Sequence, residues 1–223
     1  MPKFIYGLDP ASKNDYFGIV IHELVDEKRL PKLRFINKIT HTSFDKMYEY
    51  LLDELFVEFP PYYIVVDYTN EKTFSDLLVR RYGDKVELIR FSNTNKNKLK
   101  DDGLAILKQG YKFPNYNKIN NIKFKELIQE LIQQLKDEQI VITKSGKISF
   151  DHPSGKHNDL AIAWELSVHG CQRFMLIRDS PIVVASKKFN IFDEYDYLGT
   201  GVPQDCIPLD RAVYFPGEKV RRW

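Results

Sequence analysis

The sequence lacks long hydrophobic runs and has only two cysteines. No apolar stretch approaches the roughly 20 residues that a membrane-spanning helix needs, and the opening MPKFIYGLD has no secretory hydrophobic region. We therefore expect a cytoplasmic or host-cytoplasmic protein with no membrane association. Cys171 and Cys206 lie far apart in the chain. They fit neither a disulfide framework nor a zinc site, which excludes small disulfide-rich and zinc-finger classes.

Charge is nearly balanced overall, at +2, but it is unevenly placed. Between residues 90 and 125 there are nine lysines and arginines against two aspartates, a local net charge of +7, with aromatic residues among them. Such a stretch is compatible with a nucleic-acid backbone as partner, and equally with a solvated face balanced by acids elsewhere. On charge alone, Lys96, Lys98 and Lys100 are the candidates for phosphate contacts.

Hydrophobic periodicity predicts three strands, a helix, a strand, a helix, a strand, two helices, a hairpin and a final helix. Ser43 is the expected N-cap of the first helix, and Gly170 is expected to end the last one. The predicted strands are 3–9, 16–24, 33–40, 62–67 and 85–91, the helices are 43–59, 70–83, 96–109, 120–137 and 157–170, and the hairpin is 139–150.

An antiparallel meander followed by alternating helices and strands predicts an α/β fold. We expect one mixed sheet, with antiparallel and parallel strands, flanked by helices on both faces. Residues 1–179 would form this domain. Residues 180–223 have turn residues, scattered aromatics and no sustained period, which predicts an irregular C-terminal tail that packs on the domain or docks a partner.

Three aspartates stand at the ends of predicted elements. Asp9 ends the first strand, Asp67 ends the buried YIVVD strand, and Asp159 lies in the first turn of the last helix. If the two strands are neighbours, both carboxylates emerge at one edge of the sheet. Hard cations such as Mg²⁺ prefer carboxylate oxygens, and two such ions can clamp the attacking and leaving oxygens of a phosphodiester. A single aspartate after a strand is usually a turn residue, so spacing alone leaves both readings open.

Four segments taken in order resemble the nuclease domain of the large terminase subunit of tailed viruses. They are GLDPASKNDYFGIVI, IVVDYTNEKTFSDLL, LKQGYKFP and HNDLAIAWELSVHG, within residues 4–170. The most specific parts are the D-P-A-x(3)-D opening and the H-x-D-x-A start of the closing helix. The resemblance implies an RNase H-like fold and a two-metal endonuclease that uses Mg²⁺ or Mn²⁺ to cut concatemeric viral DNA during packaging.

Carried over residue by residue, Asp9, Asp67 and Asp159 match the metal-binding acidic triad of that family. Asp9 would bridge both ions. Asp15 matches a further acid of many members, and is equally well explained as a turn residue. His157 stands where the family often has histidine, and it would assist a metal-bound water, orient Asp159 or bond the helix start. Asn158 replaces a second aspartate of some members, and the hairpin 139–150 would regulate access of DNA.

One departure is large, because full-length large terminases also carry a packaging ATPase with a GxxxxGK[ST] phosphate loop. Neither Gly-Lys pair here is followed by serine or threonine. We therefore expect an isolated nuclease domain, monomeric by itself. Its partners by resemblance are double-stranded DNA, the ATPase domain, the small terminase subunit and the portal. The alternatives are a stand-alone RNase H-like nuclease, such as a Holliday-junction resolvase, and a non-catalytic module that docks DNA or portal.

Overall fold

A five-stranded mixed sheet forms the centre of the protein. This computed structural model describes residues 2–11, 16–40, 43–69, 72–115, 119–142, 148–151 and 157–176, with only the backbone described for strands 139–142 and 148–151. The sheet has the order β3-β2-β1-β4-β5. Its strands are β1 (Lys3–Asp9), β2 (Tyr16–Leu24), β3 (Lys32–Thr40), β4 (Pro61–Asp67) and β5 (Val86–Ile89).

The topology confirms the predicted mixed sheet. β1, β2 and β3 pair antiparallel as a meander, while β4 and β5 run parallel to β1. The two parallel neighbours β1 and β4 occupy the middle of the sheet, and their side chains are almost entirely buried. Strands buried on both faces need helices on both faces, as the near-continuous apolar sequences of β1 and β4 indicate.

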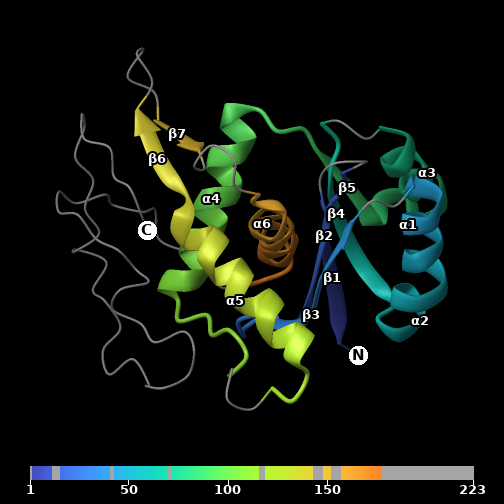
Figure 1. Ribbon diagram of the computed structural model, residues 1–223, viewed down its shortest axis with the longest axis horizontal. Helices are drawn as coiled ribbons and strands as arrows, with labels where there is room; N and C mark the ends of the chain where they lie inside the picture. Colours follow the sequence, from blue (N-terminus) through green and yellow to red (C-terminus); the bar gives the residue numbers. More distant parts are fainter. Residues whose placement is uncertain are drawn as a thin grey trace.

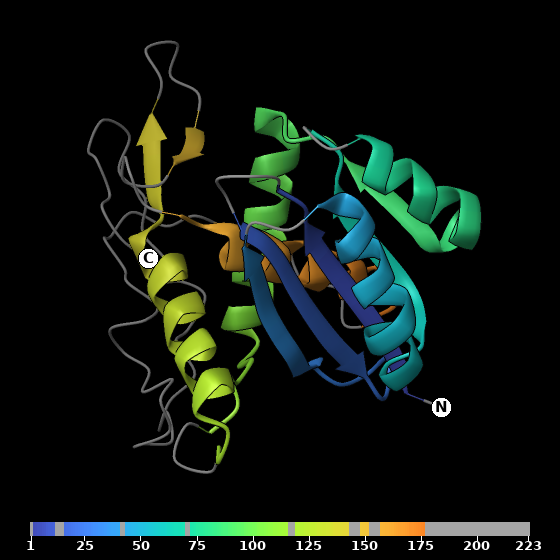
Figure 2. The same cartoon turned by 45° about the vertical axis from the view of Figure 1, so that its right-hand side comes forward.

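Helices cover both faces of the sheet (Figures 1 and 2). On one face lie α1 (Phe44–Tyr50), α2 (Phe56–Glu58) and α3 (Lys72–Tyr82). On the other lies α6 (Asp159–Gln172), covered in turn by α4 (Asn93–Lys108) and α5 (Ile122–Asp137). A separate hairpin, β6 (Gln139–Ile142) with β7 (Ile148–Asp151), follows α5. Within the described residues, no helix is both long and apolar enough to cross a membrane.

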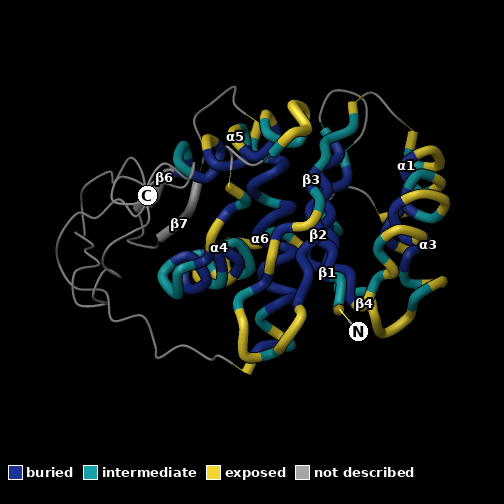
Figure 3. The backbone as a smooth tube through the Cα atoms, turned by 90° about the horizontal axis from the view of Figure 1, so that it is seen from below, coloured by how far each residue is buried: buried dark blue, intermediate teal, exposed yellow. Residues whose placement is uncertain are grey.

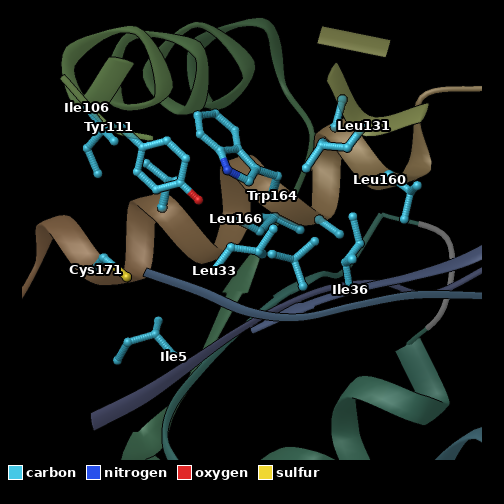
Figure 4. Close-up of a cluster of buried hydrophobic side chains, with 14 of the residues drawn as sticks. Ile5, Leu33, Ile36, Ile106, Tyr111, Leu131, Leu160, Trp164, Leu166 and Cys171 are labelled. Atoms are coloured by element: carbon cyan, nitrogen blue, oxygen red, sulfur yellow. The ribbon is translucent and has the colours of Figure 1, made fainter. Parts of the chain in front are cut away.

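Helix α6 is the central element of its face and is buried along nearly its whole length (Figures 3 and 4). Its Trp164 and Leu166 lie in a core with Ile5 of β1 and Leu131 of α5. The helix backbone sits directly on β1, because a Cβ at Gly7 would run into the Ala163 carbonyl and the Ser167 amide. A glycine at this position is therefore what permits the close approach.

One predicted helix is irregular and one predicted helix end is wrong. Ser43 is the N-cap of α1, as predicted, although its side chain makes no cap hydrogen bond, and the helix expected over 43–59 contains a π-helical segment, Leu51–Leu55. Gly170 does not end α6, which continues to Gln172. A Cβ at Gly170 would come 2.7 Å from Ile5 Cγ2, so this glycine serves the packing of α6 on the sheet.

The GYKFP segment closes the same core. Tyr111 is buried and bonds the ring of His22, 2.7 Å from its Nε2, while His22 Nδ1 lies 2.8 Å from Ser167 Oγ. Since the Ser167 hydroxyl donates to the Ile5 carbonyl, it must accept from Nδ1–H, and Nε2 accepts from Tyr111. Burial lowers the pKa of His22 to about 3, so the ring is a neutral link between the segment, β2 and α6.

His169, near the end of α6, is expected to make stability depend on pH. Its ring bonds Asp102 of α4 and Glu87 of β5. Burial alone would lower its pKa, but these bonds outweigh burial and raise it to about 9. A raised folded pKa gives stability that is complete below the unfolded value near 6.5 and is lost as pH rises through 9. In urea unfolding, His169→Gln should cost about 2–3 kcal/mol at pH 6 and much less at pH 9.5. A loss of unfolding free energy that is the same at both pH values would contradict this role of His169.

Candidate metal-dependent nuclease site

Asp9 and Asp67 lie side by side at the carboxyl ends of β1 and β4. The parallel register pairs Leu8 with Val66, so the next residue of each strand is an aspartate. Alternation places Asp67 on the same face as Val65, which packs in the core beneath α6. Asp9 has the parity of Ile5 in the same core. Both carboxylates therefore emerge at one end of the sheet, on the α6 face.

Gly18 brings the third aspartate to the same place. It is the register partner of Asp9 on β2, and a Cβ at Gly18 would lie 2.5 Å from the carbonyl oxygen of Asp159. The first turn of α6 thus rests on the strand position beside Asp9. Asp159 is in that turn, where the positive end of the helix dipole favours a carboxylate.

All three aspartates are buried, with residue exposures of 8% for Asp9, 8% for Asp67 and 5% for Asp159. Burial raises the pKa of Asp67, although hydrogen bonds from Thr69 and the charge of Lys96 act in the opposite direction. Thr69 donates from both its amide and its hydroxyl to the same oxygen, Oδ1. Burial therefore disfavours the ionised form of Asp67, and a nearby cation would favour it.

The donor set fits a hard divalent cation, since it consists of carboxylates from three elements at one end of the sheet. Among the described residues, no three histidine, cysteine or acidic side chains are already gathered as a metal-binding group. The backbone thus brings the three predicted aspartates to one end of the sheet, on its α6 face. Their joint coordination of metal remains a proposal.

His157 lies at the rim of this region. Its side chain is 49% exposed, and its Nδ1 is 3.9 Å from Asp159 Oδ2. The imidazole packs edge-on against Tyr16, with ring centroids 5.0 Å apart. This position is compatible with orienting Asp159. Asp15 lies outside the described residues, so its predicted role stays a prediction.

The three candidate lysines have different environments. Lys96 is half-buried, 5.8 Å from the centroid of the Phe91 ring, and its charge acts on Asp67. Lys98 is exposed. Lys100 does not fit the predicted phosphate contact, because it is 6% exposed and is ion-paired with Glu138 and Glu165. Its ammonium group faces the interior.

Two residues near the acids were not predicted from the sequence. Lys38 of β3 is the register partner of Gly18, and its Nζ lies 4.6 Å from the centroid of the Tyr16 ring. Gln134 of α5 accepts a hydrogen bond from the amide of Ala161 in the first turn of α6. Neither residue has a sequence signature, since each reaches the site only through tertiary packing.

The sheet order and the two helical layers define an RNase H-like fold. More specifically, it is the fold of phage large terminase nucleases. The magnesium-bound nuclease of thermophilic phage G20c matches with a TM-score of 0.59 at 15% identity, over 75% of this chain and 81% of that one. The Thermus phage P74-26 nuclease domain matches with a TM-score of 0.54 at 15% identity, over 74% and 78%.

A mutant nuclease domain of the large terminase subunit gp2 of bacterial virus Sf6, solved with manganese and β-thujaplicinol, also shares the fold. Its TM-score is 0.51 at 13% identity, over 75% of this chain and 88% of that one. No protein-family model and no curated protein matches the chain by sequence. At these identities the likeness establishes the fold, and activity has to be argued from the site.

Proposed function

We propose that this chain is the nuclease domain of a viral DNA-packaging terminase, a metal-dependent endonuclease that cuts concatemeric double-stranded DNA. The observation that carries the proposal is the backbone placement of Asp9, Asp67 and Asp159 at one end of the sheet, on its α6 face. In terminases of this fold, structures with bound magnesium and manganese support the same class of cofactor.

The three aspartates would hold two Mg²⁺ or Mn²⁺ ions. When bound, the ions supply Lewis-acid activation of water and stabilise charge on the phosphodiester. Around them, Thr69 fixes one oxygen of Asp67 with two hydrogen bonds and makes none to the other. His157, beside Asp159, orients that carboxylate or holds a proton near it.

The cellular setting follows from the proposed activity. The domain would work in the host cytoplasm with a packaging ATPase domain, the small terminase subunit and the portal. We propose that it is a monomer in isolation. Residues 177–223 lie outside the described residues, so the tail predicted over 180–223 remains a candidate docking segment.

Cleavage of supercoiled plasmid by the wild-type chain, with Mg²⁺, Mn²⁺ or EDTA, tests the proposal. We expect cutting with either ion and none with EDTA. Linear duplex and a four-way junction should be run beside the plasmid, together with gel filtration. A dimer that cuts only the junction would point to a resolvase instead. A folded protein that cuts nothing with either ion would contradict the proposed activity.

Lys96 and Lys98 are expected to contact DNA phosphates. Removing two phosphate contacts should lower the slope of log affinity against log salt by about 1.8, because each contact releases condensed counterions. Binding of duplex DNA by Lys96→Ala/Lys98→Ala, measured in EDTA between 50 and 200 mM salt, checks this. The control is Lys28→Ala/Lys32→Ala, which removes two exposed lysines at the other end of the sheet. Equal slopes in the two variants would refute the assignment.

A further inference from the structure

The first turn of α6 lacks the cap that its own sequence should supply. A helix leaves its first amide groups without intrahelical acceptors, and an N-cap side chain usually accepts one of them. In α4 and α5 the N-cap side chains do so: Ser92 accepts from Asn95, and Asn121 accepts from Phe124. At α6 the N-cap residue is Asn158, whose side chain makes no cap hydrogen bond.

Gln134 supplies the missing acceptor from another helix. Its Oε1 accepts from the Ala161 amide at 3.0 Å, the third position of α6, which an N-cap side chain normally satisfies. Gln134 is 8% exposed, so its bond is sheltered from water. Ala161 is two residues from Asp159, and the bond therefore fixes the turn that carries the third carboxylate.

The orientation of the Gln134 amide is set by a second contact. Its Nε2 donates to Glu130 Oε1 at 3.2 Å, one turn earlier on α5. The same oxygen accepts from Lys38 Nζ at 2.6 Å. With its nitrogen turned towards Glu130, Gln134 presents only its oxygen to Ala161. Lys38 itself stands in one register row with Gly18 and Asp9.

We propose that Gln134 is a positioning residue, which caps α6 from α5 and holds Asp159 in place relative to Asp9 and Asp67. The Lys38–Glu130 pair keeps its amide in the capping orientation. This inference rests on the proposed metal-dependent function. It adds a residue that touches neither DNA nor metal and acts through the backbone of α6.

Isothermal titration of the metal-free protein with Mn²⁺ tests the inference without measuring cleavage. Gln134→Met keeps the length of the side chain but removes both hydrogen bonds. Loss of a group that orients a metal ligand typically costs 10–100-fold in metal affinity, and we expect a fall of about that size for this variant. Amide hydrogen exchange should show faster exchange at Ala161. Gln133→Met, one residue away and exposed, should change neither quantity.

A swap variant separates positioning from packing. In Glu130→Gln/Gln134→Glu the new carboxylate at position 134 accepts from the Ala161 amide. The new amide at position 130 donates its N–H to that carboxylate, and its carbonyl oxygen still accepts from Lys38. The Mn²⁺ affinity of this variant should return to within about threefold of wild type, below the 10–100-fold loss expected when an orienting group is missing. If Gln134→Met does not fold, Glu130→Ala takes its place, because Glu130 is 35% exposed, and a smaller loss of affinity is expected.

The outcomes separate the two proposals. Wild-type binding of Mn²⁺ with unchanged affinity in Gln134→Met, or in Glu130→Ala where that variant is used, would overturn the positioning role and leave the nuclease proposal standing. A wild type that binds no Mn²⁺ would overturn both. Weaker binding in Gln134→Met that the swap variant restores is the result that supports the inference.

Discussion

Asp67→Asn is expected to abolish metal-dependent cleavage while stabilising the metal-free fold. Loss of a charged metal ligand should lower the cleavage rate by about 10³-fold or more. Each tenfold loss corresponds to about 1.4 kcal/mol less stabilisation of the transition state. The opposite effect on stability follows from burial, which raises the pKa of Asp67. A raised folded pKa means that the ionised group opposes folding at neutral pH. Asparagine keeps an oxygen for both Thr69 bonds and removes the charge.

Plasmid cleavage in Mg²⁺ and Mn²⁺, with thermal unfolding in EDTA, measures both effects. Asp76→Asn is the matched control, because Asp76 is an exposed aspartate on α3 and should leave rate and stability unchanged. Cleavage by Asp67→Asn at the wild-type rate would remove Asp67 from the site. A lower melting temperature in EDTA would contradict the argument from burial.

Part of the site follows directly from strand periodicity. Asp9 and Asp67 each end a run whose alternate residues are core residues, such as Ile5 and Val65. The sequence therefore predicts a carboxylate at each strand end. It does not reveal that the strands are adjacent and in register, which is what makes the two carboxylates neighbours. That information lies in the sheet order, which local patterns do not contain.

The position of Asp159 depends on glycines that are ambiguous in sequence. Gly7 and Gly18 lie inside the predicted strands 3–9 and 16–24, and Gly170 is expected to end the last helix. In the structure each marks a place where α6 and the sheet approach closely. A glycine in a strand indicates close approach of some backbone, but not which one. The identity of the partner requires the fold.

Lys100 was misassigned because a count of charges ignores helix periodicity. In α4 the buried residues include Leu99, Gly103 and Leu107, an inward stripe at helical spacing. Lys100 falls within this stripe, three residues before Gly103, whereas Lys98 falls outside it. The sequence therefore contained a signal that Lys100 points inward. Its two acidic partners, Glu138 and Glu165, come from distant segments and carried no such signal.

Lys100→Met is expected to destabilise the protein by about 3–5 kcal/mol at pH 8, because it leaves two buried carboxylates without their cation. Burial and the neighbouring Glu138 already raise the pKa of Glu165 to about 8. Without Lys100 the pKa of Glu165 should rise further, because its nearby cation is gone. A raised folded pKa opposes folding at pH values above it, so the loss of stability should shrink as pH falls and Glu165 takes up a proton.

Lys98→Met provides the control two residues away on the same helix. It should leave urea unfolding unchanged, because Lys98 is exposed, but it should reduce the salt slope of DNA binding. Lys100→Met should instead lower stability in urea unfolding and leave the salt slope of DNA binding unchanged. Adding Glu138→Gln and Glu165→Gln to Lys100→Met removes the unpaired charges and should recover most of the lost stability.

If Lys100→Met is as stable as Lys98→Met at pH 8, the ion pairs of Lys100 with Glu138 and Glu165 do not hold α4, α6 and the start of β6 together. Helix α4 would then be anchored by its apolar stripe and by the bond between Asp102 and His169.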